Sequence, residues 1–104
     1  MRRSKRQKLE KMGWRFGTAQ EFLGLSDEEA VYVELRLRLA ENLKIRRRRR
    51  NLTQSALAKL IQSSQSRVAK METGDPSVSL DLLVRSLLAL GASSRDLART
   101  ISPA

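Results

Sequence analysis

Apolar and polar side chains alternate over residues 31–39, which is the period-2 pattern typical of a half-buried β-strand. The residues on both sides favour a helix instead. Ser26 and Glu29 have the spacing of a capping box that begins a helix, and the leucines that follow are spaced by four along one helical face. No turn residue occurs before Asn51. We therefore predict one helix over residues 27–50, with a break inside the alternating stretch left open.

Four shorter helices are predicted after this one. Each begins after a serine or threonine that can cap its first turn, and turns or glycine-containing loops separate them. The predicted helices cover residues 54–61, 65–73, 80–90 and 95–101, capped by Thr53, Ser64, Ser79 and Ser94. The predicted core consists of Leu57, Ala58, Val68, Met71, Leu82, Leu83, Leu87 and Leu90. The sequence thus predicts an all-α fold.

The first 34 residues are predicted to form an N-terminal arm that is basic, aromatic and helical in part. All four aromatic residues precede residue 33. Trp14, Phe16 and Phe22 are candidate partner-binding residues, because aromatic side chains are enriched at interface hot spots. Alternatively, the aromatic residues form a small satellite core against the long helix. The predicted domains are 1–34, an arm for partner binding or dimer formation, and 35–104, a helical domain.

The net charge of the chain indicates which kind of molecule it binds. The chain of 104 residues has a formal net charge of +10, and its basic residues are concentrated in residues 1–16 and 36–50. Two such blocks suit a polyanion such as nucleic acid, although a charged surface can also serve solubility alone.

Composition excludes several other classes. The chain has no Cys and no His, so the usual metal ligands and the usual general base are missing. We expect no metal, no cofactor and no enzymatic activity. No apolar run is long enough to cross a bilayer, which predicts a cytoplasmic protein that does not bind membranes.

Two of the predicted helices, over residues 54–61 and 65–73, are joined by a tight turn and have the dimensions of a helix-turn-helix. The stretch LTQSALAKLIQSSQSRVAKMETG, followed by a leucine-rich helix that ends in Leu90-Gly91, resembles the Cro/repressor (XRE) family in the spacing of its residues. This resemblance covers roughly residues 39–92 and implies that the domain over residues 35–104 is a five-helix Cro/repressor-like helix-turn-helix domain that binds DNA. Gln62 departs from the pattern, because the family often has glycine there.

The second helix of this pair is the candidate reader of DNA bases. Gln65, Ser66 and Lys70 share one face, and glutamine suits bidentate bonding to adenine whereas lysine suits guanine. By resemblance, Gln65 and Ser66 are base readers, Lys70 reads or clamps further along, and Arg67 touches a base or a phosphate. Gln54 is a candidate phosphate ligand. The candidate DNA-binding set is completed by Thr53, Ser64, Ser77 and Ser79. Outside such a motif, each of these residues would more often be ordinary polar surface.

A looser resemblance links FLGLSDEEAVYVELRLRLAENLK and SSQSRVAKMETGDPSVSLDLL to small bacterial proteins of the HigA antitoxin type. It implies a homodimer that binds a palindromic operator in double-stranded DNA, represses its own operon and neutralises a RelE-like toxin. A homodimer also follows from geometry, since one recognition helix reads only a few base pairs. Two alternatives stay open: a stand-alone or phage-type regulator without a toxin, and a basic RNA- or ribosome-associated protein.

The five arginines at positions 46–50 are predicted to divide in function. Arg47 lies four residues after Leu43 on the core-facing stripe, and the resemblance pairs it with Glu72 as an ion pair that braces the recognition helix. The other four arginines point elsewhere around the helix. Some of them are predicted to attract phosphate, without assigning which, and none needs to read a base.

Overall fold

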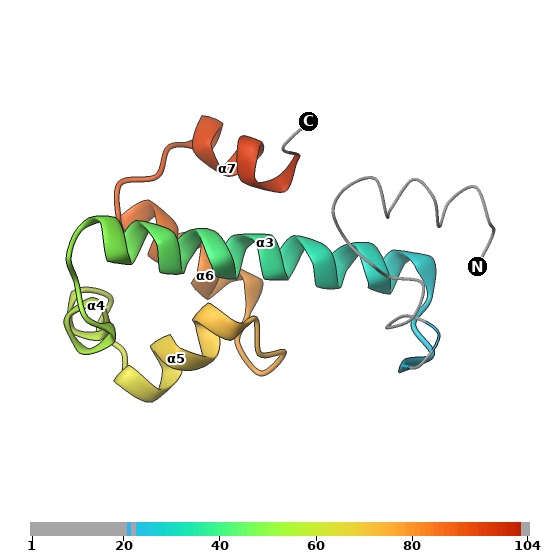
Figure 1. The fold of residues 1–104 in the computed structure, drawn as a ribbon, viewed down its shortest axis with the longest axis horizontal. Coiled ribbons are helices and arrows are strands. Elements are labelled where there is room, and N and C mark those ends of the chain that lie inside the picture. The colour runs from blue at the N-terminus through green and yellow to red at the C-terminus, as the bar shows by residue number, and fades with distance from the viewer. Residues whose placement is uncertain (1–20, 22, 103–104) are drawn as a thin grey trace. The chain divides into compact units, whose positions relative to one another are not determined.

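The computed structural model describes residue 21 and residues 23–102. The candidate partner-binding residues Trp14, Phe16 and Phe22 lie outside this part of the chain. From residue 27 onward the chain forms five α-helices, shown in Figure 1: α3 (Asp27–Arg49), α4 (Gln54–Leu60), α5 (Gln65–Thr73), α6 (Leu80–Ala89) and α7 (Ser94–Ile101). The described residues contain no β-strand. This confirms the prediction of an all-α, Cro/repressor-like fold.

The chain divides into two compact units, and the boundary falls within α3, between Leu35 and Arg36. The second unit begins at Arg36 and contains α4, α5, α6 and α7. All of the candidate DNA-binding residues therefore belong to the second unit.

The alternating stretch forms neither a strand nor a break, because α3 is continuous from Asp27 to Arg49. A capping box fixes the start of the helix. The Ser26 amide donates to Glu29 Oε1 at 3.1 Å, and the Glu29 amide donates to Ser26 Oγ at 3.2 Å. The hydrogen bond from the Ser26 amide lowers the pKa of Glu29 below its ordinary value of 4.5. At the other end, Asn51 adopts the left-handed conformation with φ of 56°.

The core of the second unit is built from one face of each of its first four helices. Its most deeply buried large apolar side chains are Leu39, Leu43, Leu57, Val68, Met71, Leu83 and Leu87. Ala58 and Leu90 are also buried as predicted. Leu82 was predicted in the core but is only half-buried. It lies about 100° around α6 from Leu83, at the edge of the buried stripe.

Local hydrogen bonds set the starts of the four later helices. Thr53, Ser64 and Ser79 each accept the predicted capping bond from the amide three residues on. The predicted cap of α7 is wrong by one residue: Ser93, not Ser94, is the N-cap. The reason is Asp96, whose carboxylate accepts from the Ser93 amide at 2.9 Å while its own amide donates to Ser93 Oγ.

The turn between α4 and α5 forms without the glycine that the family often has. Gln62 itself adopts the left-handed conformation, with φ of 55°. The turn is closed by the Ser63 amide, which donates to the Ala58 carbonyl at 2.7 Å. The α4–α5 pair therefore keeps its tight connection, at a conformational cost of about 1 kcal/mol for a residue other than glycine.

Gly74 ends α5 in a position that a larger residue cannot easily occupy. Its φ is 72°, and a Cβ there would lie 2.6 Å from Leu37 Cδ2. Gly74→Ala is expected to lower the free energy of unfolding by about 2 kcal/mol, from backbone strain plus displacement of the Leu37 side chain. Urea denaturation measures this change.

Gly91→Ala is the matched control, because Gly91 has φ of 91° but no atom within 4 Å of the added Cβ. We expect it to lower the free energy of unfolding by about 1 kcal/mol, from backbone strain alone. Equal losses at Gly74 and Gly91 would contradict a steric contribution from Leu37.

Candidate nucleic-acid interface

The two faces of α5 have opposite environments. Val68 and Met71 are fully buried against the core. Gln65, Ser66 and Lys70 are exposed. The N-cap Ser64 fixes where the helix begins, because its Oγ accepts from the Arg67 amide at 3.1 Å. The first turn of α5 therefore exposes polar side chains to solvent, while its opposite face is packed in the core.

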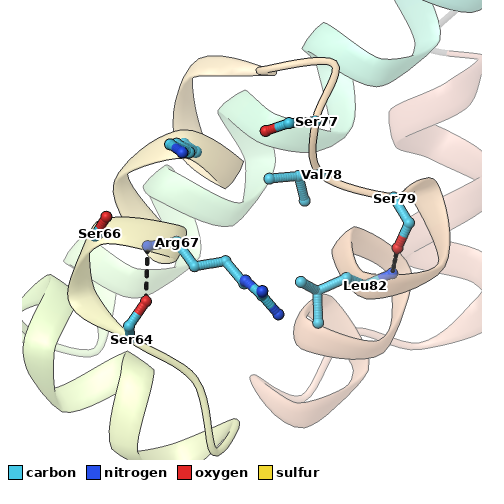
Figure 2. Close-up of a pocket in the computed structure, with 8 residues that line it drawn as sticks. Ser64, Ser66, Arg67, Ser77, Val78, Ser79 and Leu82 are labelled. Atoms are coloured by element: carbon cyan, nitrogen blue, oxygen red, sulfur yellow. Dashed lines mark hydrogen bonds between the residues drawn. The ribbon is translucent and has the colours of Figure 1, made fainter.

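A groove of about 480 Å³ lies between α5 and the start of α6. It is lined by Ser64, Ser66, Arg67, Lys70, Ser77, Val78, Ser79 and Leu82. Figure 2 shows the Arg67 side chain extending from α5 across this groove toward Leu82. Six of the nine candidate DNA-binding residues thus line one concave surface. Its two cationic side chains and four hydroxyls provide the donors that phosphate oxygens accept from.

The two glutamines among the candidate DNA-binding residues do not line the groove. They form a chain of hydrogen bonds that ends at a buried ion pair. Gln65 Nε2 donates to Gln54 Oε1 at 2.7 Å, and Gln54 Nε2 donates to Glu72 Oε1 at 3.2 Å. Arg47 donates to both oxygens of Glu72, from Nε to Oε2 and from Nη2 to Oε1 at 2.9 Å. Arg47 Nη1 also donates to the Leu52 carbonyl at 2.8 Å. An exposed side chain at the start of α5 is therefore connected to the inside of the domain.

The Arg47–Glu72 pair is buried at both ends. Arg47 is 9% exposed and Glu72 is 7% exposed. The hydrogen bond to Glu72 raises the pKa of Arg47 above its ordinary value. Because each buried charge is hydrogen-bonded to the other, neither is left to bear its desolvation penalty alone. The pair joins the end of α3 to the last turn of α5.

The arginine next to this pair has a different partner. Arg46 Nε donates to Asn42 Oδ1 at 2.8 Å, and Arg46 Nη2 lies 3.4 Å from Asp96 Oδ2 in α7. No sequence signal indicated this ion pair, which occupies one of the four arginines considered for phosphate attraction. The pKa of Asp96 lies below its ordinary value, mainly because of its hydrogen bonds with Ser93 and secondarily because of the Arg46 charge. Arg48, Arg49 and Arg50 are exposed.

The loop between α5 and α6 is held by a residue that sequence reasoning missed. Arg36 is 8% exposed, and its Nη1 donates to the carbonyls of Val78 and Asp75, the latter at 3.3 Å. Asp75 Oδ1 accepts from the Ser77 amide at 2.8 Å. The pKa of Asp75 is lowered, chiefly by its hydrogen bonds to Ser77 and less by the charges of Lys70 and Arg36. No sequence signal marked Arg36, which stood among the polar residues of the alternating stretch.

Within residue 21 and residues 23–102, no group of three or more acidic, histidine or cysteine side chains could hold a metal ion. Across the same part of the chain, no helix has the length and apolar character needed to span a membrane.

Comparison with known proteins identifies a family for this chain. The family model of the helix-turn-helix domain matches residues 38–100, which is more than half of the chain. The match includes α4, α5 and α6 in full. No curated protein and no solved structure matches the chain.

Proposed function

The chain belongs to the helix-turn-helix domain family and is a DNA-binding transcription regulator, and we propose that it is a repressor that recognises a palindromic operator as a homodimer. The observation that carries this proposal is the outward polar face of α5 beside a cationic groove. A major groove admits one α-helix, whose N-terminal side chains reach the base edges. Gln65 and Ser66 are exposed at that end of α5.

The candidate residues take different roles in this proposal. Gln65 and Ser66 read bases, and Lys70 reads or clamps a neighbouring position. Arg67 points into the groove, which supports a phosphate contact over a base contact. Phosphate contacts fix the register of a protein on the duplex without reading sequence. We assign this role to Thr53, Gln54, Ser64, Ser77 and Ser79.

The homodimer is supported by apolar surface on the last two helices. Leu88 of α6 is 48% exposed, Ile101 of α7 is 39% exposed, and α7 buries none of its residues within the single chain. A second copy packed there would cover these side chains. Two recognition helices placed about 34 Å apart would then read two half-sites of a palindrome.

We further propose that the protein is the antitoxin of a toxin–antitoxin pair and that it represses its own operon. In the first unit, the described apolar side chains Leu23, Val31 and Tyr32 are exposed. Exposed apolar and aromatic side chains are typical of protein interfaces. The partner of this unit would be a RelE-like toxin. A stand-alone regulator would have the same DNA-binding unit but no such partner.

Footprinting on the promoter of its own gene, over a series of salt concentrations, tests the proposed repressor. We expect a protected palindrome whose affinity falls steeply with salt, because each phosphate contact releases counterions. Absence of a protected site there, and of any enriched site in a random-sequence selection, would contradict a sequence-specific repressor. Competition by RNA at equal affinity would favour the RNA-binding alternative. Co-purification of a small basic protein from the neighbouring reading frame tests the antitoxin role separately.

A further inference from the structure

The loop that joins α5 to α6 carries two of the groove hydroxyls and has a fixed conformation. Gly74 in the left-handed conformation starts it, and Val78 inserts into the core with 5% of its surface exposed. The Val78 amide donates to the Asp75 carbonyl at 3.1 Å. Ser77 and Ser79, on either side of Val78, line the groove. The positions of both hydroxyls therefore depend on where this short loop is held.

Arg36 reaches this loop from α3. Its side chain does not line the groove, yet it is almost fully buried and donates to two loop carbonyls, those of Asp75 and Val78. A buried guanidinium is costly unless its donors are hydrogen-bonded. A planar fork of N–H groups can hold two acceptors in a fixed relation, which a lysine ammonium does less well. The arginine is thus placed to fix the loop from behind.

We propose that Arg36 is a positioning residue for DNA backbone binding. It holds the α5–α6 loop so that Ser77 and Ser79 face Arg67 and Lys70 across the groove, and a backbone phosphate is bound from both sides. This inference rests on the proposed function. It assigns no DNA contact to Arg36 itself. Hydroxyl hydrogen bonds depend strongly on direction, so a shift of the loop would weaken them while the cationic attraction from α5 would persist.

The test compares Arg36→Met with a matched control, Arg85→Met, in the full chain. The Arg85 side chain is 77% exposed on α6 and does not line the groove. Arg36→Met is expected to weaken binding to operator and to random DNA alike by about tenfold, because the shifted loop weakens the hydroxyl hydrogen bonds to the charged phosphate. The slope of log K against log salt should not change, because no cation leaves a phosphate. Arg85→Met should alter neither quantity.

A double-mutant cycle with Ser77→Ala separates positioning from a general loss of stability. Ser77→Ala should weaken binding in the parent protein but have little further effect in the Arg36→Met background. Additive effects, or no effect of Ser77→Ala in the parent protein, would overturn the proposal. A salt slope reduced by about 0.9 would also overturn it, by making Arg36 a phosphate ligand.

A third variant, Arg36→Lys, keeps the proposal testable if Arg36→Met fails to fold. It keeps the positive charge and can still donate a hydrogen bond to the loop. Circular dichroism should therefore show a folded protein, and its affinity for DNA should lie between those of the parent protein and Arg36→Met. Affinity equal to that of the parent protein in a folded Arg36→Lys and a folded Arg36→Met would overturn the proposal. If the parent protein itself bound no DNA sequence specifically, the proposed repressor function would fail instead.

Discussion

Replacing Arg47 by methionine is expected to lower the free energy of unfolding by about 3 to 5 kcal/mol, which is typical when one partner of a buried ion pair is removed. The variant would leave the Glu72 carboxylate in a site that is only 7% exposed. One Gln54 N–H would remain to hydrogen-bond it. The Leu52 carbonyl would also lose its donor. Urea denaturation at neutral pH measures the change, with the slope m expected to stay the same.

Two further variants show whether this loss comes from the pair. Arg48→Met removes the next arginine of the run, which is exposed, and is expected to change stability by about 0.5 kcal/mol or less. The double variant Arg47→Met, Glu72→Met removes both charges together and should recover most of the loss, because apolar residues often replace a buried ion pair without penalty. Equal effects of Arg47→Met and Arg48→Met would contradict a stabilising pair.

The features that sequence reasoning predicted well depend on residues close together in the chain. Thr53, Ser64 and Ser79 cap their helices through bonds to amides three residues away, and such bonds follow from local spacing. The same logic explains why the start of α3 was predictable despite the strand-like alternation after it. A capping box sets the start of the helix, and a row of leucines at helical spacing continues beyond the short alternating stretch.

The features that could not be predicted join distant parts of the chain. Arg36 and Val78 are 42 residues apart, and Arg46 pairs with Asp96 in a different helix. Nothing in the local spacing of Arg36 or Arg46 indicates these distant partners. The N-cap of α7 was predicted one residue too late, because either of two adjacent serines could cap the helix. Asp96 forms a capping box only with Ser93.

The sequence named the candidate interface residues one by one, but it did not predict the groove that six of them line. Serines from the α5 cap and from the next loop line one groove together with Arg67 and Lys70. The sequence places these side chains on separate elements, and only the packing of α5 and α6 makes them neighbours. The link from Gln65 through Gln54 to Glu72 is of the same kind, since its members come from two helices.

That link leads to the prediction with the largest expected effect on DNA recognition. Gln65→Ala is expected to weaken binding to the operator by about tenfold to a hundredfold, the discrimination typical of one bidentate base contact. Binding to random DNA should change little, because phosphate contacts supply that affinity. Fluorescence anisotropy with operator and random duplexes at one salt concentration measures both. Gln62→Asn, in the exposed turn before α5, is the matched control and should alter neither affinity.

Gln54→Ala should reproduce part of this loss on the operator, because Gln54 Oε1 accepts from Gln65 Nε2 and so orients the proposed base reader. The phosphate contact proposed for Gln54 would add an equal, smaller loss on operator and random DNA. The double variant is then expected to be weaker than the parent protein by less than the two single losses combined, with a coupling of about 1 kcal/mol. Strict additivity would mean that the two glutamines act independently on DNA. Equal weakening of operator and random DNA by Gln65→Ala would remove Gln65 from the base readers and leave sequence recognition to Ser66 and Lys70. If Gln65 reads a base as proposed, the hydrogen-bond chain makes specificity depend on the buried Arg47–Glu72 pair as well as on the exposed start of α5.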